Sequence, residues 1–482
     1  MILLLSQFLF VSSIQYADQT TAACISYDSS DRTIRISCNT ANLTNAYKAI
    51  NNPSILNKES EKVWFLNANI EVENGTTFFI NSTDTSWLKI NSTAGDASYI
   101  LAHGSLVIDS VKITSWDTKT NDYARSNNNG TLPRSYILVK YGSSGMTNIT
   151  NSEIAYLGYQ HANSFGLTYY TGAGSIIKNN KIHDLWYGFY SSDDTAHNIT
   201  IEDNEFYNNV KYGIDPHSGT HQMTIKNNTV HNNLKGIICS TDCHNIIIES
   251  NKVFGNSLYG IRLHKNVTDS IIRNNTVYDN KKDQISLYDF ANNNSVYDNN
   301  IKGGEYGIIV IVGSANNNIY NNSIANSTLY GLFVNTSASG NTFYSNKVKD
   351  VLISAISVNH SATSKNLFKN NHLSDSSYAV TINNNSDTMF TNNTIRTVKK
   401  SEYFLTNTSE INFYSSIFSS DIIESDNTMG NSIIIYDSGI IRIKDDTNNK
   451  SIIYDTNTSP FEYKFKAIKS IQLSSLNQTA AQ

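Results

Sequence analysis

Three side chains capable of acid–base chemistry stand close together near the middle of the chain. Tyr212, Asp215 and His217 fall within six residues, and Pro216 separates the last two. Proline fixes its own φ angle and favours extended backbone in the residue before it. We therefore expect the phenol, the carboxyl and the imidazole to be held on a short strand and its exit turn.

Such a set of groups suits proton removal from a carbon that carries a carboxylate. This reaction needs a base, a cation that neutralises the carboxylate, and a proton donor on the opposite face. His217 and Tyr212 can take the base and acid roles in either order, and Asp215 can orient the imidazole or raise its basicity. The alternative is that Asp-Pro-His is only a turn and that Tyr212 is an ordinary tyrosine of the surrounding repeat.

The element that must position these residues is a repeat of 22 to 25 residues. Its core is an apolar residue, two polar residues, Asn, a polar residue and a second apolar residue. The repeated Asn are Asn180, Asn204, Asn228, Asn251, Asn275, Asn299, Asn322, Asn346, Asn371 and Asn393. A second signature, exemplified by Tyr259-Gly260-Ile261, recurs in most periods. Two short strands per period predict an all-β protein, a right-handed parallel β-helix with about 24 residues per coil and stacked Asn ladders.

The extent of the repeat divides the chain into four segments. Residues 1–20 have the apolar run of a secretory signal, and residues 21–104 form an N-terminal cap region. Residues 105–400 form the β-helix with its catalytic groove, and residues 401–482 form a β-rich closing segment. The helical spacing of apolar residues in 40–50 predicts a short helix that covers the open end of the solenoid.

Stacking of the coils brings further polar side chains beside the central motif. Residues at equal positions in successive coils lie about 4.8 Å apart, so basic groups two coils away are roughly 10 Å from Asp215 and His217. Together these columns predict a groove for a linear polymer that lies along the helix. The substrate-binding candidates in the columns are Tyr190, Ser240, Thr241, Arg262, His264 and Lys265.

The composition narrows the class of protein. The net charge is -5 and only 16% of residues are charged, which argues against a nucleic-acid-binding surface. No apolar run after the N-terminal segment is long enough to span a bilayer. Asn-x-Ser/Thr triplets are frequent, as expected for an exported glycoprotein and equally for any repeat rich in Asn, Ser and Thr. We expect a secreted or cell-surface protein that acts as a monomer.

The cysteines form two local pairs. Cys24 and Cys38 flank a predicted hairpin, and Cys239 and Cys243 flank Ser-Thr-Asp, so each pair is a disulfide candidate in an oxidising compartment. The spacing does not favour a zinc site. We predict no metal and no cofactor, with the acidic turn Asp193-Asp194 as the weak candidate for Ca²⁺.

The motif Tyr212-Gly213-Ile214-Asp215-Pro216-His217 resembles that of the mannuronan C5-epimerases of alginate metabolism, especially the periplasmic type. The resemblance covers about 100–310, and its further matching segments are residues 113–117, 151–159, 165–167, 186–190, 236–238 and 285–288. It implies a parallel β-helix that converts β-D-mannuronate to α-L-guluronate within a polyuronate. It assigns the base and acid roles to His217 and Tyr212, with Asp215 supporting them.

Two departures from the family pattern affect the site. Ser218 stands where the family motif has an acidic residue, and Thr241 stands where the periplasmic enzymes have an Arg that neutralises the substrate carboxylate. Lys265 lines up with a basic residue of the family, and Arg262 is an additional cation.

Three functions are therefore compared. The first is C5-epimerisation of an exported polyuronate. The second is β-elimination by a lyase on the same groove, which would leave unsaturated sugar ends. The third is a glycan-binding or structural β-helix without turnover, which would show no solvent exchange at C5.

Overall fold

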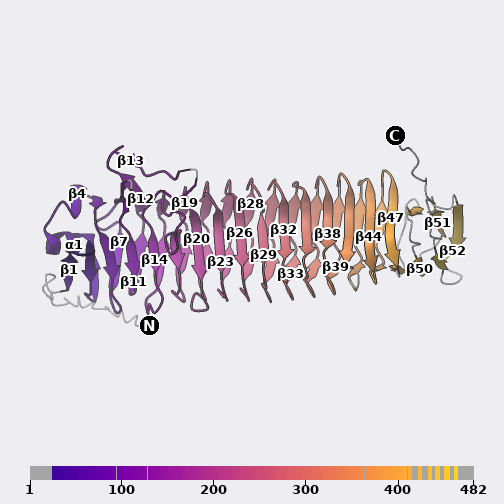
Figure 1. The fold of residues 1–482 in the computed structure, drawn as a ribbon, viewed down its shortest axis with the longest axis horizontal. Helices are drawn as coiled ribbons and strands as arrows, with labels where there is room; N and C mark the ends of the chain where they lie inside the picture. Colours follow the sequence, from indigo (N-terminus) through magenta and orange to yellow (C-terminus); the bar gives the residue numbers. More distant parts are fainter. Residues whose placement is uncertain are drawn as a thin grey trace, which may run out of the picture.

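The computed structural model describes residues 24–464, with gaps at 94, 128, 362–364, 410, 415–421, 426–431, 437–439, 446–449 and 456–460. The described chain winds into a long right-handed parallel β-helix (Figure 1). The predicted fold class is thus confirmed. The signal segment predicted over 1–20 lies outside the described residues.

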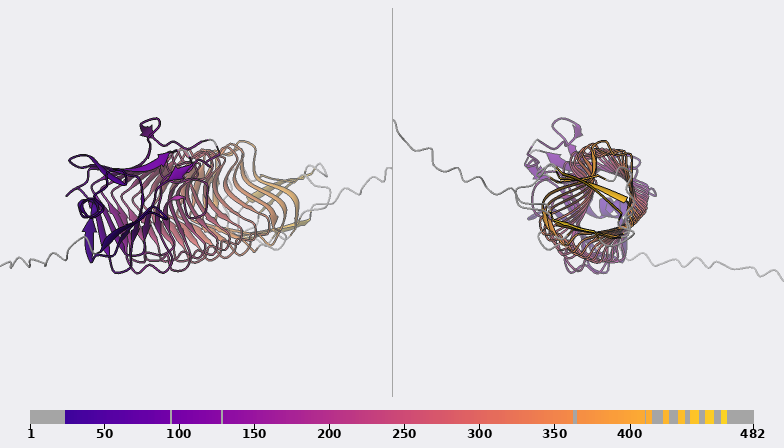
Figure 2. Two further views of the ribbon diagram at one scale, coloured as in Figure 1. Left: turned by 60° about the vertical axis from the view of Figure 1, so that its left-hand side comes forward. Right: turned by 90° about the vertical axis from the view of Figure 1, so that its right-hand side faces the viewer.

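Each regular coil contributes one strand to each of three long sheets, named A, B and C. In the end view the coils lie one behind another (Figure 2), and the register of the strands places equal positions of successive coils in columns. The coil strands of sheet A are β6 (Asn69–Val72), β10 (Ile100–Ala102), β14 (Ile137–Val139), β17 (Gly166–Tyr169), β20 (Tyr187–Ser192), β23 (Tyr212–His217), β26 (Lys235–Ser240), β29 (Ile261–His264), β32 (Asp283–Tyr288), β35 (Tyr306–Ile311), β38 (Tyr330–Asn335), β41 (Ser354–Ser361), β44 (Tyr378–Ser386) and β47 (Ser401–Ser409).

Most strands of the other two sheets are short. Each therefore contributes a single inward apolar residue to the sequence repeat. Sheet B contains β7 (Thr77–Asn81), β11 (Ser105–Asp109), β15 (Thr147–Thr150), β18 (Ile176–Lys178), β21 (Thr200–Glu202), β24 (Thr224–Lys226), β27 (Ile247–Glu249), β30 (Ile271–Arg273), β33 (Ser295–Tyr297), β36 (Asn318–Tyr320), β39 (Thr342–Tyr344), β42 (Leu367–Lys369), β45 (Met389–Thr391) and β48 (Ile411–Tyr414). Sheet C contains β5 (Val63–Leu66), β8 (Trp87–Thr93), β12 (Lys112–Asp117), β16 (Glu153–Ala155), β19 (Lys181–His183), β22 (Glu205–Tyr207), β25 (Thr229–His231), β28 (Lys252–Phe254), β31 (Thr276–Tyr278), β34 (Asn300–Lys302), β37 (Ser323–Ala325), β40 (Lys347–Lys349), β43 (His372–Ser374) and β46 (Thr394–Arg396).

The core consists of aliphatic columns that run along the axis inside the coils. On sheet A, Ile214, Ile237, Ile261 and Ile285 follow one another in register, and all four are fully buried. Burying such a side chain stabilises the fold by about 1.5–3 kcal/mol relative to leaving it in water. Because every coil repeats this arrangement, the register of the sheets is set strongly along the whole solenoid.

The repeated asparagines stack as a ladder between sheets B and C. From Asn180 to Asn393, each side-chain amide donates to the carboxamide oxygen of the next Asn at 2.9–3.0 Å. The residue before the ladder Asn has a left-handed backbone, as in Asn179 at φ +57° and Asp203 at +58°, which Asn and Asp tolerate better than most residues. The predicted Asn ladder is confirmed.

The N-terminal end carries the predicted helix, α1 (Leu43–Ile50). Asn42 caps it, and Asn42 and Asn45 form a reciprocal capping box, which satisfies backbone N–H groups that a helix start leaves free. Ahead of it, β1 (Ile25–Asp28) and β2 (Thr33–Ile36) form an antiparallel hairpin. A disulfide between Cys24 and Cys38 closes this hairpin, with Cα atoms 5.0 Å apart.

Part of the predicted cap region, residues 21–104, already belongs to the parallel coils. Strand β2 pairs in parallel with β6, which pairs in parallel with β10. Near the C-terminus the pairing changes: β51 (Ile440–Asp445) and β52 (Lys450–Asp455) are antiparallel, as are β50 (Ser432–Tyr436) and β53 (Phe461–Lys464). Among the described residues, no helix has the length and apolarity required to cross a membrane.

Candidate active site

Strand β23 presents the central motif on sheet A. It pairs in parallel with β20 before it and β26 after it, and Tyr212 lies opposite Tyr187 on one side and Lys235 on the other. Pro216 has no N–H to offer a ladder, and the register with β26 passes from Ile214 directly to His217. The strand ends at His217 and Ser218 turns with φ +42°, so the predicted strand and exit turn are confirmed.

The columns predicted from the repeat also agree with the observed register. His217 pairs with Ser240, which pairs with His264, so these three side chains lie in consecutive coils. Tyr190 lies opposite Asp215 in the coil before. Arg262 pairs with Ile238 in the preceding coil. Because Ile214 pairs with Ile237, the next residues, Asp215 and Ile238, occupy the same column as Arg262.

These coils enclose an open groove of about 490 Å³ on sheet A. Most of the predicted site residues line it. The lining residues are Tyr212, His217, Lys235, Ile238, Ser240, Thr241, Tyr259, Arg262, His264, Lys265 and Tyr288. Two predicted residues do not line this groove. Asp215 is fully buried, and Tyr190 packs in an apolar cluster with Leu138 and Tyr170, its ring centroid 5.6 Å from that of His217.

The Tyr212 phenol is held in its protonated form. Burial and the neighbouring Asp215 raise its pKa to about 12. Lys235 donates from Nζ to the Tyr212 hydroxyl oxygen at 3.2 Å, and its ammonium lies 4.7 Å from the ring centre. At neutral pH Tyr212 can therefore give a proton to a carbanion but does not start as a base.

The His217 imidazole is held in its neutral form. Burial lowers its pKa below the ordinary value, and the nearby His264 and Lys265 lower it further, because a second positive charge would repel the imidazolium. Nδ1 lies 2.5 Å from the Ser218 hydroxyl oxygen. Among the described residues Nε2 has no hydrogen-bond partner, so this nitrogen is free to accept a proton.

Asp215 does not contact the imidazole in the way we considered. No hydrogen bond joins it to His217 within the described residues, and Ser218 occupies Nδ1 instead. Burial raises the pKa of the Asp215 carboxyl well above its usual value, although Lys235 and the Ser240 hydroxyl act in the opposite direction. Among the described residues, neither carboxyl oxygen has a hydrogen-bond partner of good geometry, so Ser240 acts from nearby rather than through a formed bond.

Arg262 brings a guanidinium into the groove between two aromatic rings. Its central carbon lies 4.2 Å from the ring centre of Tyr259 and 4.1 Å from that of Tyr288. Only 9% of the residue is exposed, and its Nε has no partner among the described residues. Burial raises the pKa of Asp283 to about 6, with Arg262 acting to lower it. The rings position the cation at the groove.

Comparison with protein families places this geometry in a known architecture. The family described as "Right handed beta helix region" matches residues 80–246 and 171–324, which together cover just over half of the chain. The chain belongs to the right-handed β-helix family.

Individual members of this family support the resemblance seen in the motif. The mannuronan C5-epimerase of Pseudomonas fluorescens is 29% identical over 151 residues, 28% of this chain and 27% of that protein. The mannuronan C5-epimerase AlgG of Azotobacter vinelandii is 29% identical over 163 residues, 31% of this chain and 29% of that protein. This β-helix chain thus spans less than a third of the length of these curated relatives.

A solved structure shows the same fold over a longer stretch. The crystal structure of the periplasmic alginate epimerase AlgG superposes with a TM-score of 0.65 at 23% identity. The superposition covers 71% of this chain and 85% of that one.

Sequence reasoning missed two groove residues of this β-helix, Lys235 and Tyr259. The available signal was the repeat itself, because Lys235-Gly236-Ile237 replaces the usual Tyr of the Tyr-Gly signature. A Lys that stands between Tyr212 and Tyr259 in the same column must lie beside the Tyr212 ring. Burial lowers the Lys235 pKa, and the neighbouring Arg262 charge lowers it further.

Two further features singled out in the sequence are the acidic turn Asp193-Asp194 and the pair Cys239 and Cys243. Within the described residues no group of three or more His, Cys, Asp or Glu side chains is arranged to hold a metal ion. Asp193 instead accepts hydrogen bonds from the Thr195 N–H and hydroxyl at 3.1 Å. The second cysteine pair is not bonded: Cys239 and Cys243 are free thiols, and Cys243 directs its sulfur to the Ser240 carbonyl at 3.2 Å.

Proposed function

We propose that the protein is an exported polysaccharide C5-epimerase acting on β-D-mannuronate-type residues of a polyuronate. One observation carries the proposal. A neutral imidazole and a protonated phenol, His217 and Tyr212, line the same groove as the cations Lys235, Arg262 and Lys265. This is the set of groups that proton removal beside a carboxylate requires.

The proposed reaction has two proton transfers. Nε2 of His217 takes the C5 proton, and the electron pair of the broken C–H bond delocalises into the adjacent carboxylate to give an enediolate. The Tyr212 hydroxyl then gives its proton to C5 on the opposite face, which inverts that carbon. Solvent afterwards takes the proton from His217 and returns one to Tyr212.

The cations replace the missing family Arg in this proposal. Thr241 lines the groove but carries no charge. Lys235 enters one coil beyond Tyr212, and Arg262 enters one coil beyond Lys235. We assign these two to the substrate carboxylate, with Lys265, His264 and the Ser240 and Thr241 hydroxyls binding neighbouring sugars.

Further features support an exported enzyme with a linear substrate. The Cys24–Cys38 disulfide is typical of an oxidising compartment. The groove crosses several coils along the axis and contains several cations, as an extended anionic chain requires. The matched relatives bear the name mannuronan C5-epimerase. We also propose that the protein acts as a monomer.

Proton NMR in D₂O is the direct test. Purified protein is incubated with poly-mannuronate, and His217→Ala serves as the matched inactive variant. We expect deuterium at C5 and new guluronate signals with the wild type, and neither with the variant, because the base is gone.

Other spectra would change the assignment. Olefinic signals lost in His217→Ala would assign a lyase, since departure of the β leaving group from the same enediolate gives an unsaturated sugar. No exchange on a panel of polyuronates would contradict the enzyme proposal and favour a binding protein.

A further inference from the structure

Cations line up along sheet C in the C-terminal coils. One outward column of this sheet alternates cations with small side chains in consecutive coils. In order, its residues are Lys302, Ala325, Lys349, Ser374 and Arg396. A positive charge therefore returns every second coil, about 10 Å further along the axis.

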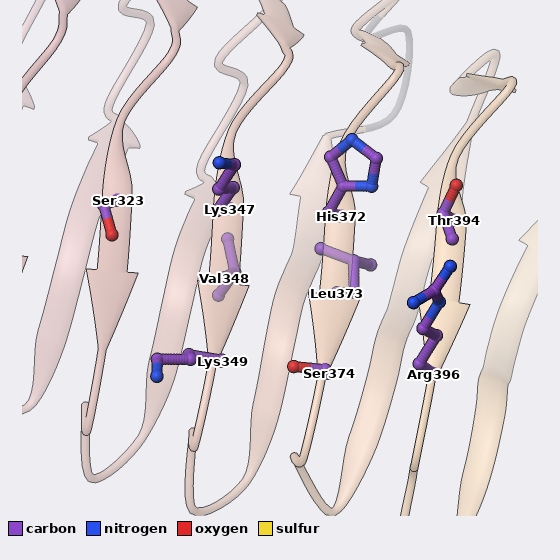
Figure 3. Close-up of a pocket in the computed structure, with 9 residues that line it drawn as sticks. All are labelled: Ser323, Lys347, Val348, Lys349, His372, Leu373, Ser374, Thr394 and Arg396. Atoms are coloured by element: carbon purple, nitrogen blue, oxygen red, sulfur yellow. The ribbon is translucent and has the colours of Figure 1, made fainter.

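The neighbouring outward column adds two more basic side chains. Lys347 lies opposite His372 in the next coil, on strands β40 and β43. We call Lys302, Lys347, Lys349, His372 and Arg396 the basic strip. Figure 3 shows four of these side chains on three adjacent strands of one face. Between them lies a shallow hollow of about 630 Å³, also lined by the small residues Ser323, Ser374 and Thr394.

The charges of the basic strip are not neutralised as they are elsewhere on this sheet. Nearer the N-terminus, Lys112 pairs with Glu153 at 2.8 Å and His231 with Glu205 at 3.2 Å. Within the described residues, the one ion pair of the strip joins Lys349 to Asp350 at 3.8 Å, and both of these side chains are well exposed. An exposed pair at that distance contributes little, so the strip is a local excess of positive charge on a protein with a net charge of -5.

We propose that the basic strip is a second binding site, for a linear carboxylated polysaccharide. It lies on sheet C, begins in the coil where the groove on sheet A ends, and shares no residue with that groove. The strip is straight, because coil stacking sets its spacing. An extended uronate chain likewise carries carboxylates that recur on one side. The small side chains between the cations leave room for sugar rings.

The identity of the polymer as a polyuronate rests on the proposed function. The face on sheet A and the face on sheet C then have different roles. The groove on sheet A carries out the chemistry, and the basic strip retains another segment of a long polymer, which keeps the enzyme on its substrate between turnovers. Nucleic acid fits less well, because the overall negative charge repels a polyanion of such high charge density.

The experiment compares two triple variants. Lys347→Gln, Lys349→Gln and Arg396→Gln remove three charges from the strip. Lys48→Gln, Lys119→Gln and Lys181→Gln remove three exposed charges elsewhere and serve as the matched control. Binding of long poly-mannuronate is measured by affinity electrophoresis at low and high salt, and turnover is measured on short oligomannuronates.

We expect the strip variant to bind long polymer about tenfold more weakly at low salt, since each exposed charge pair contributes about a factor of two. Its turnover of short oligomers should equal that of the wild type, and high salt should remove the difference in binding. The control variant should bind as the wild type does.

The outcomes separate this inference from the proposed function. Strip-dependent binding without any C5 exchange would support the strip and contradict the epimerase. C5 exchange with equal polymer binding by both triple variants would overturn the strip alone. Displacement of the polymer by duplex DNA at lower concentration than by polyuronate would assign the strip to nucleic acid and so overturn the proposal. A wild-type protein that binds no polyuronate would overturn it as well.

Discussion

At the scale of single residues, burial prepares one side chain of the candidate site as an acid and another as a base. Tyr212 and His217 lie in one groove, yet burial raises the pKa of the first and lowers that of the second. Both shifts favour the neutral form, because loss of water disfavours charge of either sign. One group is thereby ready to donate a proton and the other to accept one at neutral pH.

The pH dependence of the reaction follows from the base. His217 must be neutral to take a proton, and its pKa lies below the ordinary value because of burial and of the nearby His264 and Lys265. Activity should therefore persist below the pH at which an ordinary histidine protonates. It should be lost as pH falls through the lowered pKa of His217.

Removing one of the neighbouring charges should shift this loss. Lys265→Gln takes away a cation that disfavours the imidazolium, so the pKa of His217 rises and the acid limb of kcat/KM moves to higher pH. The pH–rate profile on poly-mannuronate measures this shift, with Lys252→Gln, on sheet C, as control. An acid limb that stays in place, or moves to lower pH, would contradict the role of His217 as base.

At the scale of elements, the Asn ladder holds the short strands of sheets B and C together. Asn228 makes side-chain hydrogen bonds to both neighbours in the ladder, Asn204 and Asn251, and donates to the Ile201 carbonyl at 2.9 Å. It is 1% exposed. Loss of its carboxamide leaves buried donors and acceptors without partners, which is costlier than loss of a single bond.

We therefore expect Asn228→Ala to lower the free energy of unfolding by about 3 kcal/mol. Asn318→Ala, at an exposed position of β36, should change it by less than about 0.5 kcal/mol. Urea denaturation followed by circular dichroism gives both values. Equal effects of the two substitutions would show that the ladder does not stabilise the coils.

At the scale of the whole molecule, each coil contacts mainly its neighbours, so stability is local along the axis. The N-terminal end is closed by α1 and by the disulfide between Cys24 and Cys38, fourteen residues apart. A loop of this length gives a stabilisation of about 3 kcal/mol. The strands that carry the groove, β23 to β32, lie well along the axis from this end (Figure 1).

Replacing Cys24 and Cys38 by Ser should therefore loosen one end without altering the site. In hydrogen exchange, peptides from β1, β2 and α1 should lose protection, and those from β20 to β32 should keep it. C5 exchange should be unchanged at moderate temperature. Loss of protection across all coils would instead indicate that the solenoid unfolds as one cooperative unit.

The architecture and the columns follow from the amino-acid sequence alone. A repeat of about 24 residues with one buried Asn and two apolar positions per turn can satisfy its backbone and bury its side chains by stacking coils. Counting positions along the repeat then identifies the neighbours of Asp215 and His217. For this reason the sequence predicts Ser240, His264 and Arg262 as residues of the site.

How side chains meet within those columns depends on the three-dimensional packing. Counting fixes the position of each Cα atom but not the rotamer, so it did not reveal that Lys235 reaches the Tyr212 hydroxyl or that Ser218, rather than Asp215, contacts His217. It did not predict that Cys239 and Cys243 stay unbonded. The basic strip likewise emerged only when residues far apart in sequence shared one face, because its charge excess depends on which acidic side chains lie within reach of its cations.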